Sequence, residues 1–532
     1  MVSAEPDPCG GAARTTDVLV AGSGAAGLAA ALTAAVLGRR VVVVERCASI
    51  GGTSALSGGR VWVPGNRFQD DPVSDRAAAR RYLAGIFDPG RAEMTEAFLT
   101  SAPEMADFVE AHTPHVFVPC PGYPDYHPGR SGATLGGRCL DMEPLSLRSV
   151  TPVADLIRMP PGYLPLRHAE WERWRQPHRY DRSLLERRRL DRTVTGGVAL
   201  VAALLDGALR AGAGVRTGLR LSELSRDGAR WAATVEQAGE TRVIRAEHVV
   251  LATGGFDQDP GLRRRYLPPG VEVSTAAPGN TGDALGLCVA AGARLENLEQ
   301  GWWTPALSIP GEHLDGVPFH RALIRERGVP RMIVVDRTGN RFADEAAPYH
   351  RFGKALQDRG PGACLVFDEG FRRRYAIPGM AAGDPVPSWV TTGDTAEALA
   401  RRLGVDPAGL AAQIGRWNQS CARGVDDEFA RGDDPYDRYY GDPDQPGNPS
   451  LGPLDEPPLH GVPIRAATMG SKGGPVTDAD ARVLGEGGIP VPGLYAVGNA
   501  AAFWTAAGYP GPGATLGVAM ALGYRAGRAT AS

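Results

Sequence analysis

Residues 22–27 have the spacing of a phosphate-binding glycine turn. They read Gly-Ser-Gly-Ala-Ala-Gly, and the acidic residue Glu45 follows 18 positions after the last glycine. In this pattern the first glycine makes a tight turn, the second lets the backbone approach a pyrophosphate, and the third lets a helix pack on a strand. The helix N-terminus favours phosphate charge, and the acid accepts hydrogen bonds from a ribose. The predicted dinucleotide-binding residues here are Gly22, Gly24, Ala25, Ala26, Gly27, Glu45 and Arg46.

Three further segments favour FAD over NAD as the dinucleotide. A second glycine cluster, GGTSALSGG, covers residues 51–59; an apolar segment ends in ATGG at 252–255; and GLYAVGN covers 493–499. The last two resemble segments that surround FAD in two-domain flavoproteins, and the cluster suits continued approach to a long cofactor. The additional predicted FAD-binding residues are Gly52, Thr53, Ser54, Ser57, Gly58, Gly59, Ala252, Thr253, Gly254, Gly498 and Asn499.

Residues 504–520 read WTAAGYPGPGATLGVAM, with one phenol, a rigid turn and no charge. A helix is predicted to begin at Ala514. Its N-terminus is expected to face the flavin's pyrimidine carbonyl and to favour negative charge there when the flavin is reduced. We therefore add Ala514, Thr515 and Leu516 to the predicted FAD-binding residues.

The predicted strands and helices that position these residues indicate an α/β fold. Residues 17–21, a helix and residues 40–45 form one βαβ unit, and a second α/β stretch begins at residue 195. The predicted architecture is a Rossmann-like FAD-binding domain, made of 17–285 and 470–532, with an inserted α+β catalytic domain, 286–469. Residues 1–16 are predicted to be disordered. The Asp-, Pro- and Gly-rich segment 420–460 is predicted to be a surface excursion and not part of a core.

Composition bounds the protein's partners and location. A length of 532 residues suits about two domains. The net charge of −3 gives no case for a nucleic-acid partner, and no apolar run reaches the roughly 18–20 residues that span a bilayer. The seven cysteines are scattered, without metal-site spacing, and the N-terminus lacks an apolar signal segment. We expect free thiols, no metal and a cytoplasmic location.

Six segments in a fixed order carry a family resemblance over nearly the whole chain. The chain resembles the flavoprotein subunits of fumarate reductase and succinate dehydrogenase, and within that superfamily it is most similar to the 3-ketosteroid Δ1-dehydrogenases. The matching segments are GGTSALSGGRVWVPGN (51–66), YPDYHPGRSGATLGGR (123–138), TGDALGLCVAAGA (281–293), NRFADEAAPY (340–349), GSKGGPVTDADARVL (470–484) and 493–520, which ends in YPGPGATLGVAM.

Departures from sister families sharpen what the resemblance implies. The second glycine cluster lacks the histidine of covalent-flavin members, so the FAD is expected to be non-covalent. The arginine and histidine clamp of dicarboxylate reducers is replaced by tyrosines at 349 and 509. Because a buried carboxylate needs a paired cation, the expected substrate is a neutral, largely apolar, steroid-like ring ketone.

The resemblance also implies roles for individual residues. Tyr509 and the N–H of Gly513 are expected to hold the ketone oxygen, and Tyr349 is expected to accept the proton from C2 while hydride leaves C1 for the flavin. A free phenol is a poor base at neutral pH. Tyr126 is therefore expected to assist Tyr349, with Tyr123 as an alternative. An external acceptor such as a quinone is expected to reoxidise the flavin.

Three other functions stay open at this point. The first is desaturation of another cyclic ketone in secondary metabolism. The second is reduction of an activated C=C bond, as in fumarate or urocanate reductases. The third is flavin binding without turnover. The tyrosines weigh against the last two. The ring system of the substrate is not fixed by the sequence.

Overall fold

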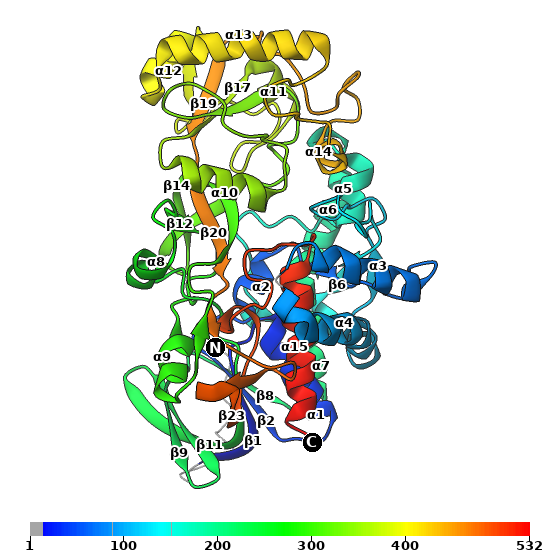
Figure 1. Ribbon diagram of the computed structural model, residues 1–532, viewed down its shortest axis with the longest axis vertical. Helices are drawn as coiled ribbons and strands as arrows, with labels where there is room; N and C mark the ends of the chain where they lie inside the picture. The colour runs from blue at the N-terminus through cyan, green and yellow to red at the C-terminus, as the bar shows by residue number, and fades with distance from the viewer. Residues whose placement is uncertain (1–13, 88, 151) are drawn as a thin grey trace.

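A parallel sheet forms the centre of the computed structural model, which describes residues 14–87, 89–150 and 152–532 (Figure 1). Its order is β23-β11-β1-β2-β8, with β22 at one edge and the β9–β10 hairpin joined through an antiparallel pairing of β10 with β11. The strands are β1 (Arg14–Ala21), β2 (Val41–Glu45), β8 (Gly214–Thr217), β9 (Arg220–Asp227), β10 (Arg230–Gln237), β11 (Glu240–Leu251), β22 (Arg482–Leu484) and β23 (Pro490–Ala496).

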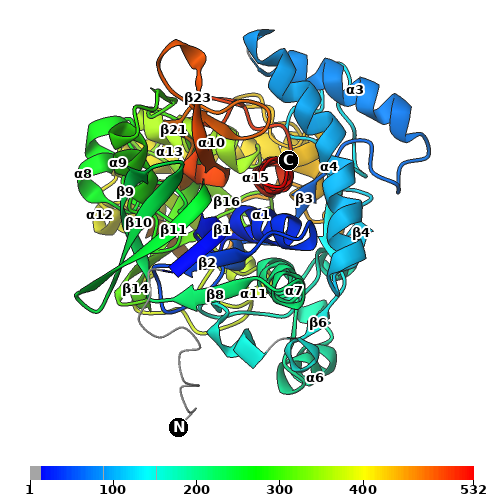
Figure 2. The same ribbon diagram turned by 90° about the horizontal axis from the view of Figure 1, so that it is seen from below.

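Strand β1 shows why the sheet is covered on both faces. Val18 and Val20 pack in one apolar core, whereas Leu19 and Ala21 pack in another on the opposite face, as the two-residue period of a strand requires. The first core contains α1 (Ala25–Val36), α7 (Gly196–Arg210) and α15 (Ala514–Ala529), which lie alongside the strands in Figure 2. The predicted βαβ unit and the α/β class are confirmed.

The N-terminal prediction needs a correction at one end. Residues 1–13 of the expected disordered segment 1–16 lie outside the described residues. Strand β1 begins at Arg14, before the predicted start at residue 17, because residues 14–16 pair with residues 244–246 of β11.

Two smaller sheets follow along the chain. One has the order β12-β20-β14-β15 and the other β16-β17-β19-β18, and the second lies at the far end of the molecule from β1 (Figure 1). Helix α10 packs on β14 and β20, between the main sheet and that far end. The bounds are β12 (Val273–Ser274), β14 (Gly301–Leu314), β15 (Val317–Ala322), β16 (Met332–Val335), β17 (Cys364–Asp368), β18 (Thr391–Gly393), β19 (Leu459–Pro463) and β20 (Arg465–Ser471).

The remaining helices surround these sheets, and several of them also contribute side chains to the first core. They are α2 (Gly52–Leu56), α3 (Pro72–Ala84), α4 (Ala92–His112), α5 (His168–Trp174), α6 (Arg182–Leu190), α8 (Pro260–Tyr266), α9 (Asp283–Ala290), α10 (Tyr349–Arg359), α11 (Glu369–Arg374), α12 (Ala396–Leu403), α13 (Pro407–Arg423) and α14 (Pro435–Tyr440). Within the described residues no helix is long and apolar enough to cross a bilayer, and no group of three His, Cys, Asp or Glu side chains is placed to hold a metal ion.

The predicted surface excursion at 420–460 is wrong in its central part. Helix α14 buries Tyr436, Tyr439 and Tyr440, and all three belong to the first core. Asp, Pro and Gly dominate the composition of this segment, but the aromatic residues decide its place because burying three phenol rings outweighs the polar composition around them.

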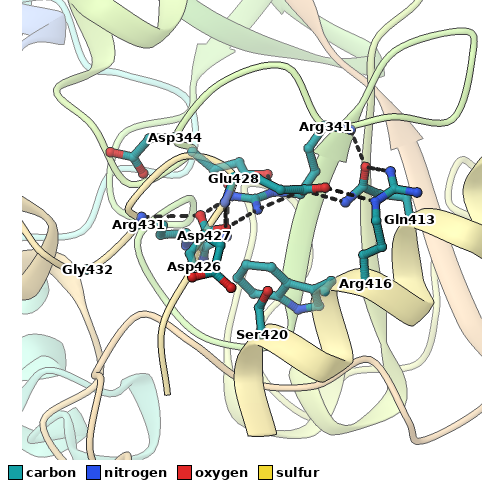
Figure 3. Close-up of polar contacts among 12 residues, drawn as sticks. Arg341, Asp344, Gln413, Arg416, Ser420, Asp426, Asp427, Glu428, Arg431 and Gly432 are labelled. Carbon is teal, nitrogen blue, oxygen red and sulfur yellow. Dashed lines mark hydrogen bonds and ion pairs between the residues drawn. The ribbon is translucent and has the colours of Figure 1, made fainter. Parts of the chain in front are cut away.

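Buried ion pairs fix the segment that leads into α10. Arg341 contacts Glu345 at 2.7 Å and Asp426 at 2.9 Å, and Arg431 contacts Glu345 at 3.3 Å; all four side chains are fully buried. Figure 3 shows Arg341 and Arg431 approaching Asp426 from two sides. Each buried charge has an opposite partner, so this ion-pair cluster ties residues 341–345 to the loop after α13.

Removing the Arg341 side chain is expected to lower the stability of the protein, because it breaks the ion-pair cluster. The variant Arg341→Met leaves two buried carboxylates short of their partner and should lower the free energy of unfolding by about 3–5 kcal/mol. Arg416→Met is the matched control, because Arg416 pairs with Glu428 near the surface and its loss should cost about 1 kcal/mol or less. Urea unfolding followed by circular dichroism measures both, and equal losses would contradict this assignment.

Candidate active site

A cavity of about 450 Å³ is lined at one end by the β1–α1 turn and at the other by three buried tyrosines. All of the predicted FAD-binding residues line it except Gly27 and Ala514. These two are buried in the packing behind the cavity wall. The predicted catalytic residues Tyr126, Tyr349, Tyr509 and Gly513 all line the same cavity.

The glycines of the β1–α1 turn each meet a different constraint. Gly22 has φ 110°, and a Cβ there would lie 2.2 Å from the Ala252 carbonyl oxygen. A Cβ at Gly27 would lie 2.2 Å from the carbonyl oxygen of Gly22, so helix and strand touch there. At Gly24 the nearest atom to a Cβ would be 3.4 Å away, which leaves that side open to the cavity. Gly24, the residue before α1, has no side chain to cap the helix, and the Ser54 hydroxyl accepts a hydrogen bond from the Ala25 N–H at 3.0 Å. This geometry leaves room for a phosphate beside backbone N–H groups.

The acid at the end of β2 and a threonine at the end of β11 complete this part of the cavity. The Glu45 carboxylate accepts hydrogen bonds from the Ser23 N–H at 3.0 Å and the Ser23 hydroxyl at 2.6 Å. The Thr253 hydroxyl is buried without a hydrogen-bond partner in the described part of the chain. An unsatisfied buried hydroxyl on the wall, together with a helix N-terminus beside it, fits a polar dinucleotide such as FAD.

Three phenols meet at the other end of the cavity. The Tyr126 hydroxyl donates to the Tyr349 hydroxyl at 3.0 Å, and the hydroxyls of Tyr349 and Tyr509 are 2.7 Å apart. The hydroxyl of Thr515 donates to that of Tyr509 at 3.2 Å. The three rings are 3–6% exposed. We call Tyr126, Tyr349 and Tyr509 the tyrosine chain.

Separate elements hold the tyrosine chain. Tyr349 is the first residue of α10, Tyr126 lies in the loop after β4 (Phe117–Pro119), and Tyr509 lies in the loop before α15. The Tyr126 N–H donates to the Pro510 carbonyl at 2.9 Å, which ties the two loops together. Gly513 has φ 83°, and a Cβ there would lie 2.6 Å from the backbone of Arg60. Its N–H donates to no acceptor among the described residues and is free for a ligand.

The structure distinguishes the two tyrosines proposed as helpers. Tyr126 contacts Tyr349, whereas the Tyr123 hydroxyl bonds to that of Tyr440 in α14. Burial raises the pKa of Tyr349 well above its usual range, while the hydrogen bond donated by Tyr126 acts to lower it because it stabilises the phenolate. Of the two, Tyr126 is thus the tyrosine in hydrogen-bond contact with Tyr349.

Sequence reasoning missed three residues of this site. Asn280 bonds the Thr53 hydroxyl at 3.1 Å and lines the cavity just before the matching segment 281–293. Lys472 lies in the matching segment 470–484; its Nζ is 3.9 Å from the centre of the Trp302 ring and donates to the Gly508 carbonyl at 2.8 Å, next to Tyr509. Arg60 lines the cavity. All three belong to or adjoin segments already quoted, but the sequence does not show which members face the cavity.

Comparisons with known proteins agree with this geometry. A family model described as "FAD binding domain" matches residues 17–516. The chain is 38% identical to a 4-oxocyclohexanecarboxylate 2-dehydrogenase of Sinomonas cyclohexanicum, over 97% of this chain and 93% of that protein. It is 36% identical to a 3-oxosteroid 1-dehydrogenase of Mycobacterium tuberculosis, over 96% of this chain and 97% of that protein.

A solved structure gives the same result for the fold. The 3-ketosteroid Δ1-dehydrogenase of Sterolibacterium denitrificans, in complex with 1,4-androstadiene-3,17-dione, matches with a TM-score of 0.90 and 34% identity. The match covers 97% of this chain and 99% of that chain. The resemblance to this family is therefore confirmed.

A glycine substitution tests whether the β1–α1 turn holds the cofactor. Gly22→Ala should lose its bound flavin and about 2–4 kcal/mol of stability, because the methyl group would overlap Ala252 and the backbone has a strained φ. Gly415→Ala in α13, where a Cβ meets nothing within 4 Å, should keep its flavin and gain about 0.5–1 kcal/mol. Full flavin absorbance in purified Gly22→Ala would contradict the assignment.

Proposed function

Because the chain belongs to the FAD-binding flavoprotein family and its cofactor is FAD, we propose that it is a dehydrogenase that introduces a C=C bond α,β to a ring ketone. The observation that carries the proposal is the tyrosine chain, with three phenols in hydrogen-bonding contact on the wall of the cofactor cavity. The relatives named above act on 3-oxosteroids and on a monocyclic oxo acid, so ring ketones are the common substrate class.

In the proposed reaction the substrate loses a proton from the carbon α to the ketone and a hydride from the β carbon. Bound FAD supplies the two-electron acceptor for that hydride. The Tyr509 hydroxyl and the Gly513 N–H donate hydrogen bonds to the ketone oxygen, where negative charge develops as the α proton leaves. Tyr349 accepts that proton. Tyr126 stabilises the phenolate form of Tyr349 by donating a hydrogen bond to the Tyr349 oxygen.

The role of the inserted segment 286–469 and the identity of the electron acceptor belong to the proposal as well. We assign residues 286–469 to a substrate-covering domain, since this segment supplies Tyr349 at the start of α10 and lies between the two parts 17–285 and 470–532. We assign reoxidation of the flavin to an external acceptor such as a quinone. FAD is held without a covalent bond in this proposal.

The direct experiment mixes the purified flavoprotein anaerobically with ring ketones. Loss of the oxidised flavin's visible absorbance on mixing with 4-androstene-3,17-dione or a monocyclic ketone, with the unsaturated ketone as product, supports the proposed function. A flavin that stays oxidised with every ring ketone, but is reduced by dithionite, would overturn it.

Single hydroxyl deletions separate the proposed roles. Tyr349→Phe should lower kcat by about 10²–10⁴, because the proton acceptor is gone. Tyr509→Phe should lower kcat by about 10²–10³, because one donor to the developing oxyanion is gone. Tyr524→Phe, in α15 and packed on Phe108, is the control that should keep wild-type turnover. Wild-type turnover in either of the first two variants would contradict the role given to that residue.

The pH dependence of turnover tests the role of Tyr126. The phenolate form of Tyr349 accepts the proton, so kcat/KM should rise with pH through an alkaline pKa. Tyr126→Phe removes a donor that lowers the pKa of Tyr349, so the rise should move to higher pH and activity at neutral pH should fall. A pH profile identical to that of the wild type would assign Tyr126 a packing role instead.

A further inference from the structure

Arg60 places a positive charge on the wall of the catalytic cavity. It follows the second glycine cluster, between α2 and β3 (Val61–Trp62), and lines the same cavity as the tyrosine chain. Its guanidinium is close to the backbone of Gly58, where a Cβ would lie 2.5 Å from Nη2. Arg60 is partly accessible, whereas its neighbours Val61 and Trp62 are fully buried, and Arg60 is the one of these three residues that lines the cavity.

The neighbours of this guanidinium do not neutralise it. Nη1 is 3.3 Å from Nδ1 of His168, and Cζ is 5.7 Å from the centre of the Tyr123 ring. Burial lowers the pKa of His168 well below its usual range, so this histidine is neutral. Nε and Nη2 of Arg60 donate to no acceptor among the described residues.

No carboxylate of the described chain pairs with Arg60. The other two arginines on the cavity wall are both paired, Arg46 with Asp283 at 3.1 Å and Arg321 with Glu312 at 2.7 Å. For Arg60 no carboxylate oxygen of the described residues lies within 4 Å. Asp141 acts on it electrostatically from further away but accepts its own hydrogen bond from the His168 N–H at 2.7 Å.

Enclosing an arginine without a counter-ion costs free energy of desolvation, and an anionic ligand that pairs with it offsets that cost. Its two free donors lie on one edge of a planar group, the geometry that a carboxylate fits with two hydrogen bonds. We infer that Arg60 binds a carboxylate on the substrate, so that the substrate is a ring ketone that also carries a carboxylate. This inference rests on the proposed function, and it differs from the expectation of a neutral, steroid-like substrate, which considered only the positions of the dicarboxylate clamp.

The two proposed contacts, one to a ketone and one to a carboxylate, define the substrate. The ketone oxygen lies at Tyr509 and Gly513, and the carboxylate lies at Arg60. The backbones of Arg60 and Gly513 touch, since a Cβ at Gly513 would lie 2.6 Å from the Arg60 backbone. We therefore expect a small ring held at Gly513 to reach the Arg60 side chain as well. A neutral ring ketone would leave Arg60 without a counter-ion.

The test compares one ring with and without its charge. The probes are 4-oxocyclohexanecarboxylate, its methyl ester and 4-androstene-3,17-dione, each mixed anaerobically with the flavin-loaded enzyme. The wild type should show a kcat/KM about 100-fold higher for the acid than for the ester, since an enclosed ion pair is lost in the ester. Arg60→Gln should lower this acid-to-ester ratio by about 100-fold, and Arg60→Lys should lower it less.

Two further measurements keep the outcome interpretable. Arg321→Gln removes a cavity arginine that already has a partner, and it should keep the wild-type ratio. Titration with 4-hydroxybenzoate, followed by the flavin spectrum, measures carboxylate binding without turnover; Arg60→Gln should weaken it and Arg321→Gln should not. Each variant is first checked for full flavin occupancy.

Different results would contradict the carboxylate site at Arg60 and the proposed function. If the ester and the steroid reduce the flavin as well as the acid does, or if Arg60→Gln leaves the ratio unchanged, the carboxylate site is wrong while the proposed function stands. If Arg60→Gln leaves the ratio unchanged and shifts the flavin's reduction potential, Arg60 serves the cofactor instead. If none of the three ketones reduces the flavin, the proposed function itself fails.

Discussion

The hydrogen bonds among Tyr126, Tyr349 and Tyr509 are the constraint on which the rest of this site depends. The three residues are far apart in sequence, and each comes from a different element, so the chain of hydroxyls forms only when α10, the loop after β4 and the loop before α15 are all in place. Burial makes each hydroxyl need a partner, and the partners are the other hydroxyls. The ion-pair cluster at Arg341 fixes the segment that leads into α10, and the hydrogen bond from Lys472 to the Gly508 carbonyl fixes the loop before α15.

The same enclosure gives the site its electrostatic character. The tyrosine chain is polar but uncharged, which suits a ketone whose oxygen gains charge only during the reaction. Arg60 adds a permanent positive charge on the same wall. The contact between Arg60 and the carboxylate is equally strong before and during the reaction, so it contributes to substrate binding. The contact with the ketone oxygen strengthens as negative charge develops there, so it contributes to the rate.

Much of the fold followed from local sequence patterns. The apolar strand at residues 17–21 and the glycine turn at 22–27 predicted the βαβ unit, since both depend on neighbours in the chain. The burial of α14 did not follow, because Tyr436, Tyr439 and Tyr440 are buried by long-range contacts that composition does not encode. Likewise the sequence named both Tyr123 and Tyr126, and only the three-dimensional contacts separated them. Arg60 stood inside a quoted segment, but its lack of a counter-ion is a property of the folded chain.

The central claim is that the tyrosine chain and Gly513 surround the reacting ketone. A crystal structure of the FAD-loaded enzyme with its unsaturated ketone product tests this most directly. The account predicts the ketone oxygen within about 3 Å of both the Tyr509 hydroxyl and the Gly513 nitrogen, with the Tyr349 hydroxyl facing the α carbon. A ketone oxygen bound away from Tyr509 and Gly513, or an α carbon facing a group other than Tyr349, would contradict it.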